Sequence, residues 1–374
     1  MVKIGIAGVR GLSSMLAIKE MPNAEVAAFC DLDKDILEQK AKEHGITKTY
    51  RIFEDMLESD IDAVIVATPM QLHFGQTAAA LEAGKHVLCE VTAGVMMDEL
   101  FWLCEAVEKY GKVYMMAENC LFIPELQMLN NMVDKGVFGS VYFGEGEYLH
   151  DIASLAVYPN KKTSWRSYWQ LGKRGCFYPT HSLGPVRKWF KNDRIKTVSC
   201  VSTGNHTSFR QEDTTLTLCQ MESGKLIKLR IDCLSKRPHN MIYYSLQGTL
   251  GAYEAPRGLG DTHKVWLTSM DDGNTDKAKW RPLSDFYDEY MPERYLNATE
   301  AQRAAGHWGG DYFIVSEFID AIEKGVHPSI DVYEACEWTA VGLLSELSVM
   351  NGGRPMSMPH FRKGMPRSEQ IITI

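Results

Sequence analysis

The 374-residue sequence contains no long hydrophobic run and no excess of positive charge. No apolar run approaches the roughly 18–20 residues that a helix needs to span a bilayer. Lysine and arginine total 40 against 48 aspartate and glutamate residues, for a formal net charge of −8. Because nucleic-acid binding depends on a basic surface that neutralises phosphates, this balance opposes it. We therefore expect neither a membrane protein nor a nucleic-acid-binding protein.

The sequence also lacks the cysteine spacing of a zinc site. Its nine cysteines are scattered singly, with no Cys-x-x-Cys pair, which is typical of reduced, buried thiols in a cytoplasmic protein. The N-terminal "MVKIGIAGVRG" becomes strand-like at once, without the basic flank and small-residue cleavage site of a signal peptide. We expect a cytoplasmic protein that uses no metal.

The pattern of apolar residues divides the chain into two parts. In residues 1–119, strand-like runs such as "KIGIAG" and "IDAVIVATP" alternate with helix-like runs, which predicts an α/β Rossmann domain with a doubly wound parallel sheet. Residues 120–374 contain a helix followed by successive strands with short glycine turns, which predicts an α+β domain with a large, mostly antiparallel open sheet. We expect the open face of that sheet to make the protein a homo-oligomer, and the polar stretch 269–305 to be a loop or lid.

The segment "GIAGVRGLSS" lies where a dinucleotide fingerprint belongs, between the first strand and the first helix. It is an imperfect copy, because Arg10 and Ser13 stand where the strict pattern has glycine. Gly8 and Gly11 still allow a tight turn whose N–H groups can meet a pyrophosphate, and Gly8, Arg10 and Gly11 are expected to contact the cofactor. Asp31 ends the second strand, where a carboxylate accepts hydrogen bonds from ribose hydroxyls and repels a 2′-phosphate. The cofactor expected from this pattern is NAD rather than NADP.

The strings "AVIVATPMQLHF" and "ALEAGKHVLCEV" show a strand that ends in Ala-Thr-Pro, a histidine four residues after the proline, and a second strand that ends in glutamate. This pattern resembles the glucose–fructose oxidoreductase/inositol dehydrogenase (Gfo/Idh/MocA) family over essentially the whole chain. The resemblance implies hydride exchange between NAD(P) and a sugar or cyclitol hydroxyl. It also implies that Thr68, Pro69, His73 and Glu90 lie near the cofactor.

One departure from that family is informative. Many members carry Glu-Lys-Pro at the end of the fourth strand, with the lysine beside the reacting carbon, whereas this chain has Glu90-Val91-Thr92. Valine cannot transfer a proton, so either activity is lost or the acid/base groups lie elsewhere. The Glu-Val pair resembles a subgroup that includes the NAD-dependent glycosidases of family 109. Five further strings resemble that subgroup: "MAENCLF", "GEYLHD", "SWRSY", "FYPTHSLGP" and "GHWGGDYF".

The resemblance to that subgroup implies three catalytic residues by the sugar: Tyr148, Tyr178 and His181. A histidine side chain, which titrates near about 6.5 in peptides, is a natural base for a sugar hydroxyl. A tyrosine phenol titrates near about 10 and can orient the sugar or act second. We expect His181 to take the hydroxyl proton, and Tyr178 or Tyr148 to perform any extra proton transfer.

Seven further residues are candidates at the same two sites. Glu118 and Asn119, at a strand end, are expected near the nicotinamide ribose. The residues expected at or just behind the sugar are His150, Asp151, Trp165, Arg166 and His307. The pair His150–Asp151 with His181 is also a conceivable metal group, but no partner has ligand spacing. Arg166 on Trp165 is alternatively a salt-bridged arginine stacked on packed tryptophan.

Three functions compete at this point. The leading hypothesis is an NAD-dependent oxidoreductase that oxidises a ring hydroxyl of a sugar or glycoside, at C3, to a keto-sugar. The first alternative is an NAD-dependent glycosidase that runs oxidation, elimination, hydration and reduction with the NAD recycled. The second is an NAD-binding subunit that lost catalysis with the lysine.

Overall fold

The structure is a computed structural model that describes the chain except for residues 271–272, 274–277 and 368–374. The chain forms two compact units. The first comprises Met1–Phe122, Thr299–Ala340 and the segment that begins at Pro359, and the second comprises Ile123–Ala298 and Val341–Met358.

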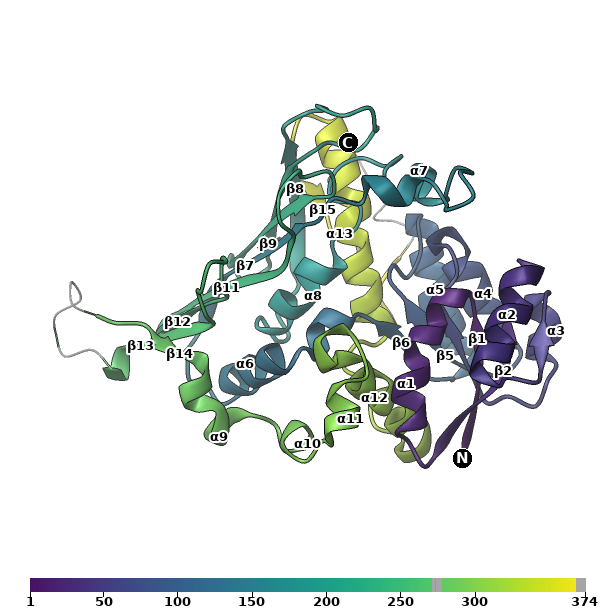
Figure 1. Cartoon of the computed structure of the whole chain (residues 1–374). Coiled ribbons are helices and arrows are strands. Elements are labelled where there is room, and N and C mark those ends of the chain that lie inside the picture. The colour runs from purple at the N-terminus through teal and green to yellow at the C-terminus, as the bar shows by residue number, and fades with distance from the viewer. Residues whose placement is uncertain (271–272, 274–277, 368–374) are drawn as a thin grey trace. The chain divides into compact units, whose positions relative to one another are not determined.

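The first unit is built on a six-stranded parallel sheet, in the order β3-β2-β1-β4-β5-β6 (Figure 1). Its strands are β1 (Val2–Ala7), β2 (Ala24–Cys30), β3 (Thr49–Tyr50), β4 (Ala63–Val66), β5 (His86–Glu90) and β6 (Tyr114–Ala117). Every residue of β4 is buried, as the uniformly apolar run around it predicts for a strand covered on both faces. The predicted doubly wound parallel sheet is confirmed.

Helices connect these strands. They are η1 (Val9–Ser14), α1 (Met15–Lys19), α2 (Lys34–His44), α3 (Phe53–Leu57), η2 (Met70–Leu72), α4 (His73–Glu82), α5 (Met97–Tyr110) and η3 (Asn119–Phe122). The ends of α2 follow from single residues. The Asp33 side chain accepts hydrogen bonds from the first turn, and Gly45 ends the helix with φ 72°, a conformation that glycine adopts without a steric cost.

The chain returns to the first unit after residue 298. This return contains α11 (Glu300–Arg303), η8 (His307–Gly309), α12 (Gly310–Lys324) and the first part of α13 (Val332–Met350). Helix α12 packs against α1 and buries Phe313, Val315 and Phe318. The sequence-based boundary assigns these residues to the second domain, 120–374, whereas Thr299–Ala340 belong to the first unit. This return stabilises the first unit, because α12 packs on α1 and removes the apolar faces of both helices from water.

The second unit is built on a nine-stranded sheet, in the order β14-β13-β12-β11-β7-β10-β9-β8-β15. Its strands are β7 (Val141–Leu149), β8 (Ile195–Ser202), β9 (Thr215–Met221), β10 (Leu226–Asp232), β11 (Asn240–Gly248), β12 (Gly251–Glu254), β13 (Lys264–Leu267), β14 (Arg281–Pro282) and β15 (Met356–Ser357). Only the β7–β10 pairing is parallel among the described pairings of this sheet. The prediction of a mostly antiparallel sheet is confirmed.

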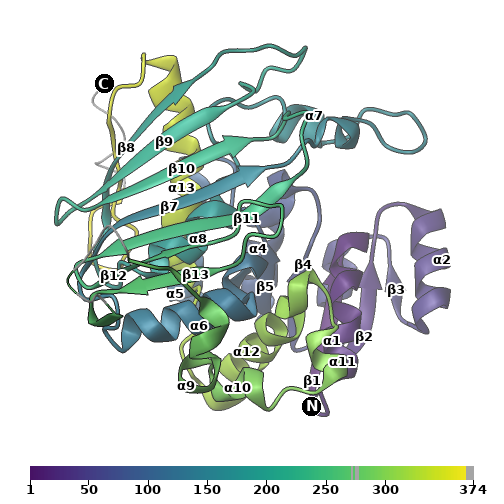
Figure 2. The same cartoon turned by 60° about the vertical axis from the view of Figure 1, so that its left-hand side comes forward.

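Helix α8 (Thr180–Lys188) lies against one face of this sheet (Figure 2). Two glycines of β7 allow the close approach: a Cβ on Gly146 would lie 2.2 Å from the Ser182 carbonyl oxygen, and a Cβ on Gly144 would lie 2.5 Å from Val186. The opposite face exposes apolar side chains. Leu216 and Leu218 of β9 are 40% and 43% exposed.

Short helices complete the second unit. They are α6 (Pro124–Asp134), η4 (Ala153–Ala156), α7 (Arg166–Trp169), η5 (Thr268–Met270), η7 (Leu283–Phe286), α9 (Tyr287–Tyr290) and α10 (Glu293–Leu296). Several of them fall in the polar stretch 269–305 that was expected to be a loop or lid. Within the described part of that stretch, Leu283 and Tyr295 are buried, so these two apolar side chains anchor short helical turns.

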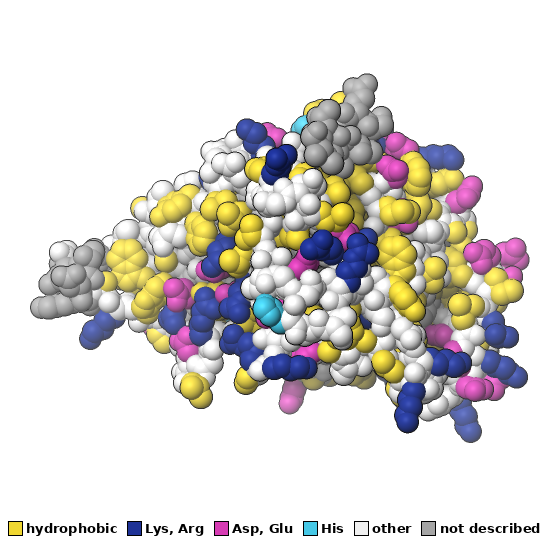
Figure 3. All heavy atoms as spheres, turned by 90° about the horizontal axis from the view of Figure 1, so that it is seen from above, with side chains coloured by type: hydrophobic (Ala, Val, Ile, Leu, Met, Phe, Trp, Pro, Cys, Tyr) yellow, Lys and Arg dark blue, Asp and Glu magenta, His cyan; other side chains and the backbone are white. Residues whose placement is uncertain are grey.

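Within the described residues, no helix has both the length and the apolar character needed to cross a membrane. Figure 3 shows lysine and arginine side chains interspersed with acidic ones over one face of the molecule.

Candidate functional site

The fingerprint turn of the first unit keeps its glycines where side chains would clash. Gly8 has φ 90°, and a Cβ on it would lie 2.5 Å from the Ala67 carbonyl oxygen. A Cβ on Gly11 would lie 2.7 Å from the side chain of Ile6. The turn between β1 and η1 is therefore as tight as a dinucleotide fingerprint requires, although Arg10 and Ser13 break the strict pattern.

Asp31 closes this turn from the end of β2. Its Oδ2 accepts a hydrogen bond from Val9 N at 3.0 Å, and its Oδ1 accepts one from Asp33 N at 3.0 Å. A carboxylate oxygen has two lone pairs, so each Asp31 oxygen can still accept a ribose hydroxyl. The close backbone approach at Gly8 and the position of the Asp31 carboxylate beside the turn are both features of an NAD-binding site.

The sequence prediction missed an arginine beside Asp31. Arg51 follows β3, and its Nη2 donates to the Leu32 carbonyl oxygen at 3.2 Å. A guanidinium is the group that accommodates a 2′-phosphate, so Arg51 and Asp31 favour opposite cofactors. The pairing of β3 with β2 brings position 51 next to position 32. Because the two positions are 19 residues apart in the chain, the residues around Asp31 alone do not reveal this arginine.

His73 is buried between the ends of β4 and β5. Its Nδ1 lies 2.7 Å from the Thr92 carbonyl oxygen and its Nε2 lies 2.8 Å from the Thr68 carbonyl oxygen. Carbonyl oxygens only accept, so both ring nitrogens donate and the ring is an imidazolium. Burial lowers the pKa of His73, but the interactions with Cys89 and with both carbonyl oxygens outweigh it and raise the pKa to about 9.

This arrangement makes His73 a bridge between two strand ends. Its direct contact with the cofactor stays a prediction, as do those of Thr68 and Pro69, which follow β4. Thr68 donates through Oγ1 to Gln76 at 2.6 Å. The bridge fixes the backbone of Thr68 and Thr92, and thereby the shape of this edge of the sheet.

Other predicted cofactor residues gather at the same carboxyl edge of the sheet. Arg10 Nε donates to Glu90 Oε2 at 3.1 Å, so the turn after β1 is joined to the end of β5. Glu118 is fully buried, and its Oε1 accepts a hydrogen bond from Cys120 N at 3.1 Å. Asn119 begins η3, directly after β6. The carboxyl edge is where open parallel sheets bind nucleotides.

His307 lies in the first unit and pairs with Asp311. Its Nδ1 is 2.8 Å from both carboxylate oxygens. The hydrogen bond to Asp311 raises the pKa of His307. The sequence reasoning expected His307 at the sugar and did not single out Asp311, although the i, i+4 spacing of the two residues is visible in the string.

The three residues predicted to be catalytic form one cluster in the second unit. Tyr148, near the end of β7, stacks on His181 with ring centroids 5.4 Å apart. Tyr178 meets His181 edge-on at 5.1 Å and Tyr148 at 6.2 Å. Tyr148 and Tyr178 are 7% and 8% exposed. Their assembly from two separate strings follows from α8, whose first turn carries His181 over β7.

The backbone of His181 is itself held. The Tyr244 hydroxyl, from β11, donates to the His181 carbonyl oxygen at 2.7 Å, and Gly146 of β7 leaves room for the helix. His181 therefore lies in the first turn of a helix that is fixed to the sheet, and not in a mobile loop.

A second imidazole pair adjoins the cluster. His150 lies edge-on to Tyr148 at 5.7 Å, and its Nδ1 is 2.8 Å from Nδ1 of His239. Burial, and then the neighbouring His239, lower the pKa of His150. Asp151 pairs with Lys236. The loop between β10 and β11 thus contributes His239 and Lys236, which the sequence reasoning missed because nothing in the string "SKRPHN" marks them as partners of residues 150 and 151.

Arg166 stacks on Trp165. Its guanidinium carbon is 4.4 Å from the Trp165 ring centroid, and its Nη1 donates to the Gln170 side chain. This geometry matches the alternative of an arginine stacked on a tryptophan, except that the guanidinium pairs with the Gln170 amide and not with a carboxylate. Contact of Arg166 and Trp165 with a sugar stays a prediction.

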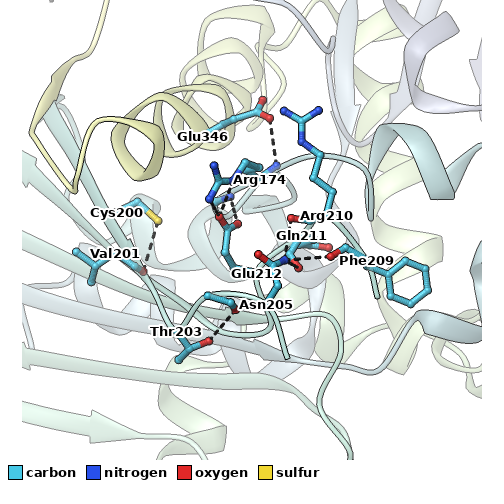
Figure 4. Close-up of polar contacts among 12 residues, drawn as sticks. Arg174, Cys200, Val201, Thr203, Asn205, Phe209, Arg210, Gln211, Glu212 and Glu346 are labelled. Atoms are coloured by element: carbon cyan, nitrogen blue, oxygen red, sulfur yellow. Dashed lines mark hydrogen bonds and ion pairs between the residues drawn. The ribbon is translucent and has the colours of Figure 1, made fainter. Parts of the chain in front are cut away.

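The loop before Tyr178 is held by a buried carboxylate (Figure 4). Glu212 accepts hydrogen bonds from Arg174 Nε at 2.7 Å and from Gly175 N at 2.9 Å. Glu212 is 1% exposed. A buried carboxylate is stable only when such donors satisfy it, so Glu212 and the loop depend on each other.

Helix α13 supplies the other two acceptors of this loop. Glu346 Oε1 accepts from Arg174 N at 3.1 Å, and Ser345 Oγ accepts from Cys176 N at 2.8 Å. The amide of Asn205 closes the loop that carries Glu212 by donating to the carbonyl oxygens of residues 209, 210 and 211. Three consecutive N–H groups, at positions 174 to 176, are thus fixed just before Tyr178.

Comparison with known proteins identifies the class and then the family. Residues 2–118 match the model described as oxidoreductase family, NAD-binding Rossmann fold. With the fold and the fingerprint turn above, this match defines an NAD-binding protein of the Gfo/Idh/MocA oxidoreductase class. Residues 124–207 and 195–367 match the model described as glycosyl hydrolase 109, C-terminal domain. The chain belongs to glycosyl hydrolase family 109, as the resemblance predicted.

Two curated relatives are similar to this protein over nearly the whole chain. A glycosyl hydrolase family 109 protein of Saccharopolyspora erythraea is 30% identical over 97% of this chain and 84% of its own length. A Shewanella oneidensis protein named alpha-N-acetylgalactosaminidase is 29% identical over 97% of this chain and 85% of its own length. Levoglucosan dehydrogenase, solved with NADH and levoglucosan, has the same fold, with a TM-score of 0.80 at 19% identity over 96% of this chain and 100% of its own.

Proposed function

We propose that this protein is an NAD-dependent oxidoreductase that oxidises a ring hydroxyl of a sugar or glycoside, at C3, to a keto-sugar. The cluster of Tyr148, Tyr178 and His181 carries the proposal, because it places a partly exposed imidazole in contact with two buried phenols. NAD, held at the turn after β1, would supply the hydride acceptor for this oxidation and, in a redox-neutral cycle, the hydride for the final reduction.

His181 is the base for the hydroxyl proton. When the C3 hydroxyl is oxidised, the carbon loses a hydride, the oxygen loses a proton, and the C–O bond becomes a carbonyl. The proton goes to a ring nitrogen of His181, whose position is fixed by α8 and Tyr244. The Tyr178 phenol, edge-on to this imidazole, orients the sugar oxygens. Neither role requires the lysine that Val91 replaces.

The second candidate is a glycosidase, and the names of the family 109 relatives favour it. A ketone at C3 acidifies the C2 proton, because the resulting carbanion is delocalised into the carbonyl. Tyr148 or Tyr178 then removes that proton, and the electron pair expels the C1 substituent as the aglycone. Water adds across the new double bond at C1, and reduction of C3 restores the sugar.

Incubation with NAD and a panel of aryl glycosides tests both candidates. Steady growth of NADH absorbance supports the dehydrogenase, and release of aglycone without net NADH supports the glycosidase. His181→Ala should lower kcat at least about 100-fold, the scale of a lost general base, with NADH affinity near that of the wild type. An unchanged kcat would overturn the role of His181, and NADH binding without turnover on any glycoside would favour a subunit that has lost catalysis.

Self-association is part of the proposal. Leu216, Leu218 and Val201 are exposed on one face of the nine-stranded sheet, and Val201 pairs with Leu216 across β8 and β9. An apolar stripe on a paired sheet face is a surface that a second copy would cover.

We also place the protein in the cytoplasm. All nine cysteines are buried free thiols. A reducing compartment maintains thiols in this state.

A further inference from the structure

One end of the nine-stranded sheet is positively charged. The residues that connect the strands at this end form three loops, 150–179, 203–214 and 233–239, which are named the cationic loops. The strand registers place them together, where β7, β8 and β10 finish and β9 and β11 begin. The loops contain eight lysines and arginines against three acidic residues, a formal net charge of +5. Because the whole chain has −8, all other residues together carry −13.

Backbone hydrogen bonds join the cationic loops into one surface. Ile152 N donates to the Cys233 carbonyl oxygen at 2.9 Å. Gln211 N donates to the Leu171 carbonyl oxygen at 3.0 Å. Residues 157–163 of the first loop form a short hairpin, and Figure 2 shows the chain beside α7 extending beyond the strand ends. Side chains from all three loops can therefore act on one ligand.

Four exposed cations of these loops have no carboxylate partner in the part of the chain that the structure describes: Lys161, Lys162, Arg210 and Arg237. The nearby acids have other partners. Glu212 pairs with Arg174, and Asp151 pairs with Lys236. Uncompensated charge of one sign attracts and steers ligands of the opposite sign. The cationic loops are therefore suited to an anionic ligand.

The same loops expose aromatic rings beside the proposed catalytic cluster. Tyr158 and Tyr168 are 42% and 64% exposed, and an exposed aromatic ring can pack on the apolar C–H face of a sugar. His150, the first residue of the loops, lies edge-on to Tyr148 with ring centroids 5.7 Å apart. A sugar held by the cluster therefore has the cationic loops as neighbours in the second unit.

We propose that the cationic loops bind the acidic part of an oligosaccharide, which carries sulfate or carboxylate groups beside the sugar that the cluster holds. These groups accept charge-assisted hydrogen bonds from ammonium and guanidinium donors. This inference rests on the proposed function, and it narrows the substrate class to acidic glycosides. Single-stranded RNA has similar chemistry, with phosphates and stacking bases, but a long polyanion would also meet the −13 of the other residues.

Fluorescence anisotropy of the full-length protein tests this binding without any turnover. The probes are a labelled chondroitin sulfate hexasaccharide, the same hexasaccharide after desulfation and carboxyl reduction, and a hexauridylate. We expect the acidic hexasaccharide to bind at least about tenfold more tightly than the neutral one, with an advantage that shrinks as salt is raised. Equal affinities for the two hexasaccharides, or tighter binding of the hexauridylate, would overturn the inference.

Two variants locate the site. Lys161→Glu combined with Lys162→Glu, and separately Arg237→Glu, should each raise the Kd of the acidic hexasaccharide at least about fivefold, so either one gives the readout if the other does not fold. The matched control, Lys196→Glu combined with Lys225→Glu, changes the charge near the start of β8 and in the turn before β10, at the opposite end of the sheet. It should leave Kd within about twofold of wild type, because salt screens distant charges. An equal loss in this control would mean that only net charge matters, which contradicts the inference.

Kinetics separate this inference from the proposed function. On a panel of glycosides, the double variant at positions 161 and 162 should raise KM for acidic glycosides and leave kcat and the KM for neutral ones unchanged. Binding of the acidic hexasaccharide without turnover of any glycoside would support the surface and contradict the proposed oxidation. Turnover without any preference for acidic glycosides would support the oxidation and overturn the inference.

Discussion

A histidine held between two carbonyl oxygens has to carry two protons, and this makes His73 a titratable part of the fold. The sequence marks position 73 only through the resemblance, which places it near the cofactor. Its two hydrogen bonds come from Thr68 and Thr92, the latter 19 residues away. No local pattern encodes which strand ends will lie on either side of an imidazole, because that depends on the β4–β5 pairing.

His73 should stabilise the protein more at neutral than at alkaline pH. The folded-state pKa of about 9 lies above the value near 6.5 of an unfolded histidine. The stabilisation is therefore fully present below about pH 6.5 and is lost as the pH rises through about 9, with a total on the order of 3 kcal/mol. Urea unfolding of wild type and His73→Gln from pH 6 to 10 measures this. The difference in free energy of unfolding should shrink over that interval, and a constant difference would contradict the assignment.

At the scale of elements, the longer strands were accessible from the sequence, whereas the short strands β3, β13, β14 and β15 were not predicted. The uniformly apolar run around β4 predicts a strand buried on both faces, and β4 is fully buried. In β9, buried and exposed side chains alternate, as is typical of a strand with one covered face. The string "LGPVRKWF" indicates a helix that starts near Leu183, whereas α8 begins at Thr180, so that His181 is in its first turn. The three acceptors that hold residues 174–176, namely Glu212, Ser345 and Glu346, are called the cradle here, and they could not be predicted from the sequence. Nothing in the sequence marks Glu212 and Glu346 as these acceptors, because only the folded chain brings Glu212 to Gly175 N and Glu346 of α13 to Arg174 N.

Removing the cradle should slow turnover without weakening cofactor binding. Glu212→Ala leaves Arg174 and Gly175 N without this acceptor, so Tyr178 and His181 lose their fixed position. We expect a loss of stability of roughly 3 kcal/mol, as for a broken buried ion pair. We also expect kcat to fall at least about tenfold, because a misplaced catalytic group is costly. Kinetics at a temperature where the variant is folded, together with NADH titration, check this.

Two further variants separate positioning from stability. Glu212→Gln retains an acceptor for Gly175 N and should recover part of kcat. Glu222→Ala removes the exposed Arg194–Glu222 pair and should change stability by less than about 1 kcal/mol and leave kcat unchanged. If Glu212→Ala lowers stability while kcat stays at the wild-type value, the cradle does not position the cluster.

At the scale of the whole molecule, the exposed apolar face of the nine-stranded sheet is the feature with consequences. Leu216→Lys combined with Leu218→Lys should reduce the molecular mass measured by light scattering, because two charges would have to be buried in the contact. NADH affinity should not change. Leu259→Lys, at a fully exposed position outside the strands, should leave the mass unchanged. A wild type that is monomeric at micromolar concentration, or a double variant with the wild-type mass, would contradict the proposed self-association.

The return of α12 to the first unit also sets the order in which a nascent chain can mature. Residues 123–298 separate the two main segments of that unit, and a ribosome needs roughly 10–35 s to add those 176 residues at about 5–20 residues per second. Throughout that delay the apolar face of α1 has no α12 to cover it. During synthesis this face is therefore transiently exposed apolar surface, and the edge to which Arg10, Glu90, His307 and Asp311 belong is completed only after α12 has been made.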